Sequence, residues 1–433
     1  MHKMKDSGVP WIGDMPEHWS TGRIGQLYTE RKERVSDTEY VPLSVTMKGV
    51  LPQLSTAAKT DAHDDRKLVH KGDFAINSRS DRRGSCGISP YDGSVSLINT
   101  ILTPRGELHP LYYDWLFHAS MFSDEFYKWG HGIVNDLWTT NWNDMKRITV
   151  PMPPFEEQAR IAAFLDAECT RIDSIIEQTH NSIEEYKKLK LVVITQAVTK
   201  GIRPGIEMKD SCIDWIDTIP SNWKVKSVGT LFEFVGGYAF SSDRFTTRTS
   251  NQVVRIGNVK DDDLRLTEKA VYIDDAYAQE ANSVIAMPND ILFTMTGTKG
   301  KQDYFYTLVV SKNDVADKKL YINQRVGCFR AKEFCNMQYF DYLLKVKDLK
   351  DYIFLYETGT ANQGNLGIST IRKAKLLVPP IIEQHAIVEF LSNKCRDIDS
   401  LIETKGKLIT ELEAFKKSLI YEYVTGKKEV PVA

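Results

Sequence analysis

Two short loops carry the residue types best suited to contacts with nucleic acid. Each follows an apolar run that predicts a buried strand, Asp73-Phe74-Ala75-Ile76 in one case and Asp290-Ile291-Leu292-Phe293 in the other. Small, hydroxyl and basic side chains on loops that contain glycine suit phosphate contacts, and Arg or Gln suits base edges. An ordinary solvated turn is the alternative for each loop. The candidate contact residues are Arg79, Ser80, Arg82 and Arg83 from the first loop, Thr296, Thr298, Lys299, Lys301 and Gln302 from the second, and Tyr238 after Gly236-Gly237.

Catalytic motifs are missing from the sequence. There is no G-x-x-x-x-G-K-[ST] phosphate loop, and the His residues form no H-E-x-x-H pattern. Met152-Pro153-Pro154-Phe155 is similar to the [DNS]-P-P-[YF] motif of amino-methyltransferases, but Met152 replaces the polar residue that would hold the target amine. No Gly-rich cofactor loop accompanies it. We therefore interpret this segment as a Pro pair at the start of a helix, and expect neither catalytic residues nor a metal site in this chain.

Composition limits the class of protein. The 433 residues are 42% hydrophobic and 26% charged, which suits two or three ordinary globular domains. The net charge of −2 means that a nucleic-acid surface would need its basic residues concentrated on one face or supplied partly by a partner. The six Cys form no C-x-x-C pair, which favours a reducing, cytoplasmic setting. No apolar run is long enough for a membrane span, and the N-terminus lacks the apolar region of a secretory signal.

The chain contains an internal repeat at its edges. Trp11-Ile12 and Trp19 recur as Trp215-Ile216 and Trp223, at a constant offset of 204 residues (11 to 215, 19 to 223). A later block recurs at an offset of 226 residues (158 to 384), so the centre of the second half is longer by the difference, 22 residues. That later block is Pro153-Pro154, Glu157-Gln158 and Phe164-Leu165, matched by Pro379-Pro380, Glu383-Gln384 and Phe390-Leu391.

A long amphipathic helix is predicted after each Pro pair. Apolar residues recur at alternating steps of three and four, which is typical of a coiled-coil seam. About 40 residues at 1.5 Å each span roughly 60 Å, which argues against the alternative of a helix lying on one small core. The predicted seam is Ile161, Leu165, Ile172, Ile175, Tyr186 and Leu189 in the first helix, and Ile387, Leu391, Ile398, Leu401, Leu408, Leu412, Phe415 and Leu419 in the second.

The central segments predict mixed helix and strand. Runs such as SVSLINTILTP and YINQRVGCFRA indicate strands, and short helices are expected near Leu111 to Lys128 and Met337 to Tyr352. If the two seams pack together, the connectivity makes the long helices antiparallel. We predict an α+β fold of two pseudo-symmetric globular domains separated by two long antiparallel coiled-coil helices. The predicted boundaries are 1–155 and 201–380 for the domains, and 156–200 and 381–433 for the helices.

The repeated motifs resemble the conserved regions of the specificity subunit of type I restriction-modification enzymes. The resemblance covers essentially the whole chain, in the right order and twice. Cys212, Asp214 and Asp217 depart from the glycine-containing pattern of the first copy. The segments that carry the resemblance are MKDSGVPWIGDMPEHW with MKDSCIDWIDTIPSNW, VPMPPFEEQARIAAFLD with LVPPIIEQHAIVEFL, and AVTKGI with YVTGK.

The resemblance implies a cytoplasmic DNA-recognition subunit of a phage-defence system. Each central segment would be a target-recognition domain for one half of a split, asymmetric sequence in double-stranded DNA. The helices would set the unread spacer and dock two modification (methyltransferase) subunits. S-adenosylmethionine, ATP and Mg would belong to those subunits and to the restriction (endonuclease and translocase) subunits. Two alternatives are an enzyme in its own right, either an adenine methyltransferase or a nuclease, and a coiled-coil scaffold that binds no nucleic acid.

Overall fold

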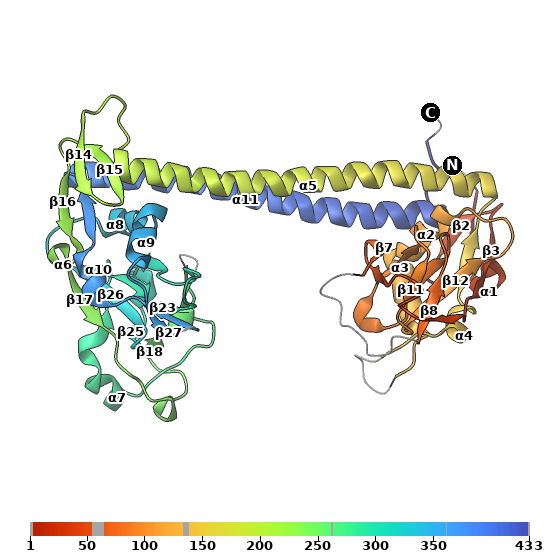
Figure 1. The fold of residues 1–433 in the computed structure, drawn as a ribbon, viewed down its shortest axis with the longest axis horizontal. Helices are drawn as coiled ribbons and strands as arrows, with labels where there is room; N and C mark the ends of the chain where they lie inside the picture. Colours follow the sequence, from red (N-terminus) through yellow and green to blue (C-terminus); the bar gives the residue numbers. More distant parts are fainter. Residues whose placement is uncertain (1–2, 54–64, 133–137, 261–262, 361, 432–433) are drawn as a thin grey trace. The chain divides into compact units, whose positions relative to one another are not determined.

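The computed structural model describes residues 3–53, 65–132, 138–260, 263–360 and 362–431. The chain forms two compact units, each built from one central segment and a part of both long helices (Figure 1). Unit 1 comprises Met1–Asn181 and Thr404–Ala433, and unit 2 comprises Ser182–Glu403. In the described part of the chain, no helix has the length and apolar character needed to cross a membrane.

Unit 1 contains short strands and helices followed by the first part of a long helix. Its helices are α1 (Ile24–Leu27), η1 (Ser80–Arg82), α2 (Pro110–His118), α3 (Ser120–Lys128), α4 (Trp142–Met145) and the beginning of α5 (Phe155–Lys200). Its strands are β1 (Met4–Asp6), β2 (Asp14–Pro16), β3 (Ser20–Arg23), β4 (Tyr28–Glu30), β5 (Arg34–Val35), β6 (Leu43–Thr46), β7 (Gly49–Pro52), β8 (Arg66–Val69), β9 (Phe74–Asn77), β10 (Cys86–Ile88), β11 (Gly93–Val95), β12 (Asn99–Pro104) and β13 (Thr149–Met152).

Unit 2 follows the same order with additional strands. Its helices are α6 (Val228–Leu231), η3 (Ser242–Arg244), η4 (Ile256–Asn258), α7 (Asp275–Glu280), η5 (Asn282–Val284), η6 (Asn313–Val315), α8 (Met337–Leu344), α9 (Lys347–Phe354), α10 (Ile368–Lys373) and the beginning of α11 (Ile381–Val424). Its strands are β14 (Met208–Ile213), β15 (Ile216–Pro220), β16 (Lys224–Ser227), β17 (Phe232–Gly236), β18 (Asn251–Val254), β19 (Val259–Lys260), β20 (Asp263–Leu264), β21 (Ile285–Ala286), β22 (Ile291–Thr294), β23 (Thr296–Gly297), β24 (Thr307–Val309), β25 (Lys319–Ile322), β26 (Val326–Ala331), β27 (Thr358–Thr360), β28 (Gln363–Asn365) and β29 (Lys375–Val378).

Each unit is organised around a four-stranded antiparallel sheet. Its strand order is β10-β9-β12-β4 in unit 1 and β17-β26-β22-β24 in unit 2. The unit 1 sheet neighbours β11-β8-β5, and the unit 2 sheet neighbours β18-β25-β21, in which β18 and β25 are parallel. The hairpins β1-β2 and β14-β15 and the pairs β3-β13 and β16-β29 correspond to the repeated edges of the sequence. The predicted α+β class is confirmed.

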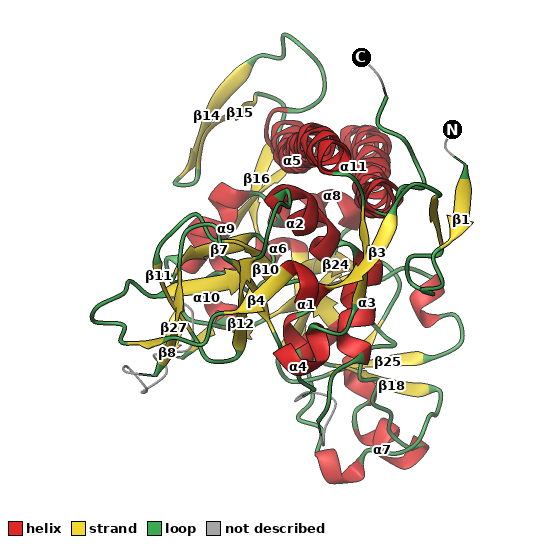
Figure 2. Ribbon diagram, turned by 90° about the vertical axis from the view of Figure 1, so that its right-hand side faces the viewer, coloured by secondary structure: helices red, strands yellow, loops and turns green. Residues whose placement is uncertain are grey.

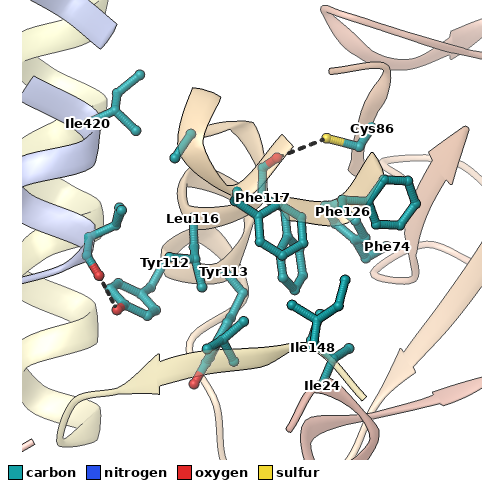
Figure 3. Close-up of a cluster of buried hydrophobic side chains, with 14 of the residues drawn as sticks. Ile24, Phe74, Cys86, Tyr112, Tyr113, Leu116, Phe117, Phe126, Ile148 and Ile420 are labelled. Atoms are coloured by element: carbon teal, nitrogen blue, oxygen red, sulfur yellow. Dashed lines mark hydrogen bonds between the residues drawn. The ribbon is translucent and has the colours of Figure 1, made fainter. Parts of the chain in front are cut away.

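The apolar runs singled out in the sequence form the central strands. All four residues of β9 and of β22 are buried, as expected for strands covered on both faces. Helices α2 and α3 supply Phe117 and Phe126 to the core of unit 1, where Phe117 lies 4.8 Å from the ring of Phe74 (Figure 3). In unit 2 the rings of Phe293 and Phe329 stack at 4.3 Å. A Cβ at Gly327 would come within 2.4 Å of the Phe293 ring, so the stacking requires glycine there.

The repeated Trp, Glu-Gln and Pro-Pro motifs fasten the start of each long helix to its unit. The Trp11 indole donates to the Thr149 carbonyl (3.1 Å), and the Trp215 indole donates to that of Lys375 (3.0 Å). Gln158 accepts from the His109 backbone N–H and donates to the Pro153 carbonyl. In the second copy Gln384 accepts from the Asn336 N–H and donates to Pro379. Trp11 and Trp215, and Gln158 and Gln384, thus make the same hydrogen bonds in the two units.

The far end of the other long helix is fastened to each unit by a buried tyrosine. Tyr112 in α2 donates from its hydroxyl to the Val424 carbonyl at 2.7 Å (Figure 3). Tyr339 in α8 donates in the same way to the Val198 carbonyl at 3.0 Å. Val424 and Val198 are related by the offset of 226 residues (198 to 424). Each unit therefore holds the beginning of one long helix and the end of the other, so the two helices run antiparallel within each unit. Figure 2 shows α5 and α11 side by side.

Two matching ion pairs set the register of the helices. In unit 1 the ammonium of Lys416 in α11 lies 2.6 Å from the carboxylate of Asp173 in α5. In unit 2 Lys190 in α5 lies 2.8 Å from Asp399 in α11. Both partners obey the same offset of 226 residues (190 to 416, 173 to 399). The two units thus use one antiparallel helix register.

The predicted seam residues differ in burial. Ile161, Leu165 and Ile172 are buried in α5, and Ile387, Leu391, Ile398 and Leu419 are buried in α11, while Tyr186 and Leu412 are half-buried. The seam assignment is wrong at Ile175, Leu189, Leu401, Leu408 and Phe415, because these side chains are between 36% and 51% exposed. The seam position there lies one residue further along and is occupied by Ile176, Lys190, Ile402, Ile409 and Lys416.

The wrong seam assignment at these positions has a physical cause. Several turns carry two adjacent apolar residues, such as Leu401-Ile402 and Leu408-Ile409, and apolar periodicity alone accepts either member of each pair. The partner helix covers only one of them. Other seam positions, Lys190, Lys405 and Lys416, are lysines, which apolar periodicity does not identify. The corrected seam retains the 226-residue offset at Cys169 and Cys395, Ile172 and Ile398, Ile176 and Ile402, and Ile183 and Ile409.

Neighbouring residues of α11 provide a direct test of this register. Replacing the buried Ile409 with Ala should lower the free energy of unfolding by about 2 kcal/mol, because it removes buried methyl groups. The matched control Leu408→Ala should change it by less than about 0.5 kcal/mol, because Leu408 is 41% exposed. Urea unfolding followed by circular dichroism measures both. A greater loss for the Leu408 variant would show that the original seam assignment was right.

Candidate nucleic-acid interface

The first candidate loop, residues 79–84, is attached to a second segment of unit 1. The Arg79 N–H donates to the Asn77 side chain at 3.0 Å, and the Ser80 N–H donates to the Trp138 carbonyl at 2.9 Å. Isolated β-bridges join Arg79 to Thr139, and Thr139 to His131. The candidate loop is therefore paired at Arg79 with the segment that contains Thr139, which in turn pairs with His131.

The arginines of this loop differ in their surroundings. Arg83 forms an ion pair with Asp124 (3.0 Å), and its guanidinium lies 5.1 Å from the centre of the Tyr127 ring. The Arg82 side chain is 68% exposed, with Asp81 at 3.6 Å. Arg83 is thus committed to contacts within the protein, whereas Arg82 extends into solvent.

The second candidate loop, residues 294–302, is also largely held by internal contacts. The Thr298 N–H donates to Asp303 (2.7 Å), and hydrogen bonds from Thr298 keep the pKa of Asp303 below its usual value. Lys299 donates to the Gly359 carbonyl (3.0 Å), and Gln302 donates to Asp351 (3.1 Å). Lys301 is exposed at the turn. Thr296 faces a groove described below.

Tyr238, the third candidate site, makes contacts within the protein through both its ring and its backbone. Its ring packs against Phe240 and Tyr277, at 4.9 and 6.0 Å between centres. Its N–H donates to the Ile322 carbonyl, and its own carbonyl accepts from the Gln324 N–H. A Cβ at Gly237 would lie 2.0 Å from the Asn323 carbonyl oxygen, so the glycine allows close approach to protein backbone.

Three strands and a connecting turn form a continuous backbone platform in unit 2. The sheet has the order β23-β28-β27, with Thr296 opposite Asn365. The Leu366 N–H donates to the Met295 carbonyl, and the Met295 N–H donates to the Arg325 carbonyl. The turn at Gln324 and Arg325 is thereby joined to the hairpin. β23 and β27 lie close together in Figure 1.

Glu357 holds this platform to the second candidate loop. Its carboxylate accepts from the Tyr304 hydroxyl at 2.7 Å and from the Gly300 N–H at 2.9 Å. Burial and the hydrogen bond to Glu357 raise the pKa of Tyr304, so its hydroxyl stays protonated and remains a donor. The carboxylate thus connects the loop before β24 with the hairpin that follows α9.

The platform borders two open grooves that share Arg325. The first, the amide groove, has a volume of about 550 Å³ and is lined by Met295, Thr296, Gln324, Arg325, Gly359, Thr360, Gln363 and Asn365. The second, the basic groove, has a volume of about 600 Å³ and is lined by Arg255, Ile256, Gly257, Asn258, Lys260, Arg265, Glu268, Lys269, Asn323 and Arg325.

The charge of the two grooves differs. Among the lining residues that the structure describes, the basic groove has five cationic side chains and one carboxylate. Arg255 donates to the Lys269 carbonyl, and Arg265 lies within 4 Å of Asp263 and Glu268. The amide groove has only Arg325 as a charged residue among the lining residues that the structure describes. Phosphate suits the first environment, and hydrogen-bonding base edges suit the second.

Sequence reasoning identified Thr296 but missed the other polar residues of the grooves. Gln324 and Arg325 lie in a turn between two buried strands, and Gln363 and Asn365 lie 61 or more residues from the candidate loop (302 to 363). Only the short polar, glycine-containing stretch TGTANQGN could have signalled the hairpin. Its position beside β23 follows from the tertiary fold.

Comparisons with known proteins agree with the sequence motifs. Residues 220–414 match the family model described as "Type I restriction modification DNA specificity domain". The type I restriction enzyme MjaVIII specificity subunit of Methanocaldococcus jannaschii is 24% identical over 432 residues, which cover 96% of this chain and 94% of that protein. The putative MjaX specificity subunit of the same organism is 25% identical, with coverage of 97% and 96%. The resemblance inferred from the motifs is confirmed.

Solved structures show the same fold. A chain from a structure reported as the "structural basis underlying complex assembly and conformational transition of the type I R-M system" has a TM-score of 0.72 at 14% identity, covering 96% of this chain and 99% of that one. The HsdS subunit from Thermoanaerobacter tengcongensis has a TM-score of 0.55 at 16% identity, with coverage of 96% and 98%.

The connection made by Glu357 can be tested separately from any ligand. Glu357→Ala removes the acceptor for Tyr304 and Gly300, and such hydrogen bonds to a charged group contribute about 1.5–3 kcal/mol each. Amide hydrogen exchange should therefore become faster at Gly300 and in Thr358–Thr360, and stay unchanged in β22 and β26.

The control is Glu333→Ala, because Glu333 pairs with Lys226 outside the platform. If Gly300 exchanges at the same rate in both variants, Glu357 does not hold the loop.

Proposed function

We propose that this chain, a type I restriction-modification specificity subunit, reads one half of a bipartite, asymmetric DNA target with each of its units. The observation that carries the proposal is a polar loop that follows the buried central strand of each unit. In both units this loop is joined to a neighbouring segment by a short stretch of β-pairing. The side chains differ: arginine and serine follow β9, whereas threonine and amide residues surround β23. Similar supports with different polar surfaces suit two different half-sites.

The long helices would set the spacer between the half-sites. Both are continuous, 46 residues for α5 and 44 for α11, so no hinge of irregular backbone interrupts them. The matching Lys–Asp pairs fix one antiparallel register in both units. A rigid helix pair with a fixed register is suited to define a separation in base pairs.

The apolar residues outside the seam offer docking surfaces for two modification subunits. Ile175 and Phe415 in unit 1, and Leu189 and Leu401 in unit 2, each directly precede a seam residue. In an antiparallel pair such positions on the two helices share one flank. Exposed apolar groups arranged in this way are typical of protein interfaces. The offset of 226 residues makes the two surfaces alike (175 to 401, 189 to 415), as two copies of one partner require.

The chemistry would occur on the partner subunits. S-adenosylmethionine would be used for methyl transfer to adenine by the modification subunits, and ATP and Mg would be used by the restriction subunits. Purified chain incubated with DNA and S-adenosylmethionine should transfer no methyl group until the modification subunit is added. Methylation by the chain alone would overturn the proposal in favour of an independent methyltransferase.

Sequence preference is tested with the assembled complex. Methylome sequencing of a host that expresses the chain with its modification subunit should give one asymmetric motif of two parts with an unread spacer. Methylation without sequence preference, together with gel shifts that show none, would favour a coiled-coil scaffold that binds no specific DNA.

The arginines of unit 1 should act on one half-site only. Arg79→Ala combined with Arg82→Ala should weaken binding to the intact target and have little effect once the first half-site is scrambled, because the second unit is unchanged. Arg83 is kept because it is paired with Asp124. The control is Arg105→Ala, an exposed arginine that follows β12. Equal weakening on targets with either half-site scrambled would indicate a general electrostatic role.

The helices should control the spacer. Inserting one heptad into both α5 and α11 at positions related by 226 residues lengthens each by about 10 Å and preserves the seam. The tolerated spacer should become longer while both half-sites stay the same. Selection of bound sequences from a library of spacer lengths measures this. An unchanged spacer in a folded, active variant would show that the helices do not set it.

A further inference from the structure

We infer that unit 2 reads adenine in its half-site through the amide side chains of Gln324, Gln363 and Asn365, while the adjacent basic groove holds the phosphate backbone. The inference rests on the proposed function and names the contacts by which that function would be carried out. All three amide residues are exposed, and all three line the amide groove.

The donor and acceptor chemistry of the groove selects the base. A primary amide offers a carbonyl acceptor and an N–H donor side by side, which matches the N6 amino group and N7 of adenine in the major groove. Guanine presents two acceptors at the same edge and is matched by Arg or Lys. Three amides and one arginine line this groove, so adenine is the base that its side chains match most fully.

The neighbouring basic groove has the composition of a phosphate site. Lys260, Lys269 and Arg325 are exposed there, and Arg325 lies at the boundary with the amide groove. Because successive phosphates flank the base edges of a duplex, cations beside a neutral hydrogen-bonding groove match the arrangement of backbone and bases.

The amide residues are attached to a preformed frame. Gln324 is held by its backbone N–H on the Tyr238 carbonyl, and Asn365 lies in β28 opposite Thr296. The strand partner of β28 on its other side is β27, whose residue Thr360 pairs with Gln363. Amide side chains on paired backbone lose less conformational freedom on binding than side chains on an unpaired loop.

Close packing of the frame depends on two glycines of this hairpin. A Cβ at Gly364 would meet the Glu357 carboxylate at 2.1 Å, and a Cβ at Gly359, which has a φ of +120°, would meet the Gln363 carbonyl oxygen at 2.0 Å. The hairpin thus lies directly on Glu357, the residue that also holds Gly300. The backbone that carries Gln363 and Asn365 therefore has a fixed placement before any ligand arrives.

Isosteric substitutions test the base assignment in the complex of the full chain with its modification subunit. Gln363→Glu and Asn365→Asp keep the shape of each side chain and replace the amide donor with an acceptor. A carboxylate accepts from the cytosine amino group but cannot donate to adenine N7. Affinities are measured for a panel of duplexes in which every base pair of the wild-type target is replaced in turn.

We expect at least one acidic variant to lose its preference for adenine at one position of the second half-site, by about tenfold in affinity. The affinity for duplexes with cytosine at that position should rise. The first half-site should be read as before. Gln279→Glu, at an exposed glutamine of α7 that lines neither groove, should leave the panel unchanged.

A uniform loss across the panel, an unchanged panel for both variants, or a shift at a position other than adenine would overturn the inference and leave the proposed function intact. A wild-type complex that shows no sequence preference at all would overturn the proposed function itself.

The proposed phosphate contacts of the basic groove are tested by the salt dependence of DNA binding. Lys260→Ala combined with Lys269→Ala should weaken binding to every duplex of the panel about equally, and should lower the slope of log affinity against log salt by about two. A change in base preference with an unchanged slope would show that these lysines do not contact phosphate.

Discussion

The antiparallel register of α5 and α11 is the constraint on which the rest of the structure depends. Two ion pairs define it, Lys416 with Asp173 in one unit and Lys190 with Asp399 in the other. Both positions are partly exposed, so the free energy from each pair is small. Their importance is geometric: a shift of one residue would break both pairs and turn Ile402 and Ile409 away from the partner helix. The register therefore determines which apolar residues are buried and which remain exposed.

The repeated edges of the sequence attach two unlike centres to this common support. Gln158 and Gln384 hydrogen-bond the beginning of one long helix to its unit. Tyr112 and Tyr339 hydrogen-bond the end of the other long helix to the same unit. These contacts need particular residue types at particular positions, so they recur in both halves. Surface residues such as Arg82 in unit 1 make no comparable contact with the helices, so the polar surfaces can differ while the support stays the same.

The sequence predicted the features that rest on periodicity and repetition, and failed where tertiary packing decides. The α+β class, both long helices and the central strands follow from apolar patterns and the repeated motifs. The helix register did not, because Leu401 and Ile402 are adjacent and equally apolar, and only the position of the partner helix separates them. Of the residues that line the amide groove of unit 2, the sequence indicated only Thr296, since Gln324 and Gln363 come beside it through backbone pairing of segments distant in sequence. Chemistry spread over several segments leaves no local motif.

The most direct measurement exchanges the congruent central segments of the two helices, placing 395–416 in α5 and 169–190 in α11. The account predicts a folded protein with a similar melting temperature, and a methylated motif with the same half-sites and spacer, because Cys, Ile, Ile and Ile recur at matching seam positions and both Lys–Asp pairs re-form. Residue 179 differs in type from residue 405, and residue 186 differs from residue 412. Because both segments are exchanged together, each of these side chains still lies across the seam from the same opposite side chain. Loss of folding, or a changed half-site or spacer, would contradict the claim that one shared register supports two independent readers.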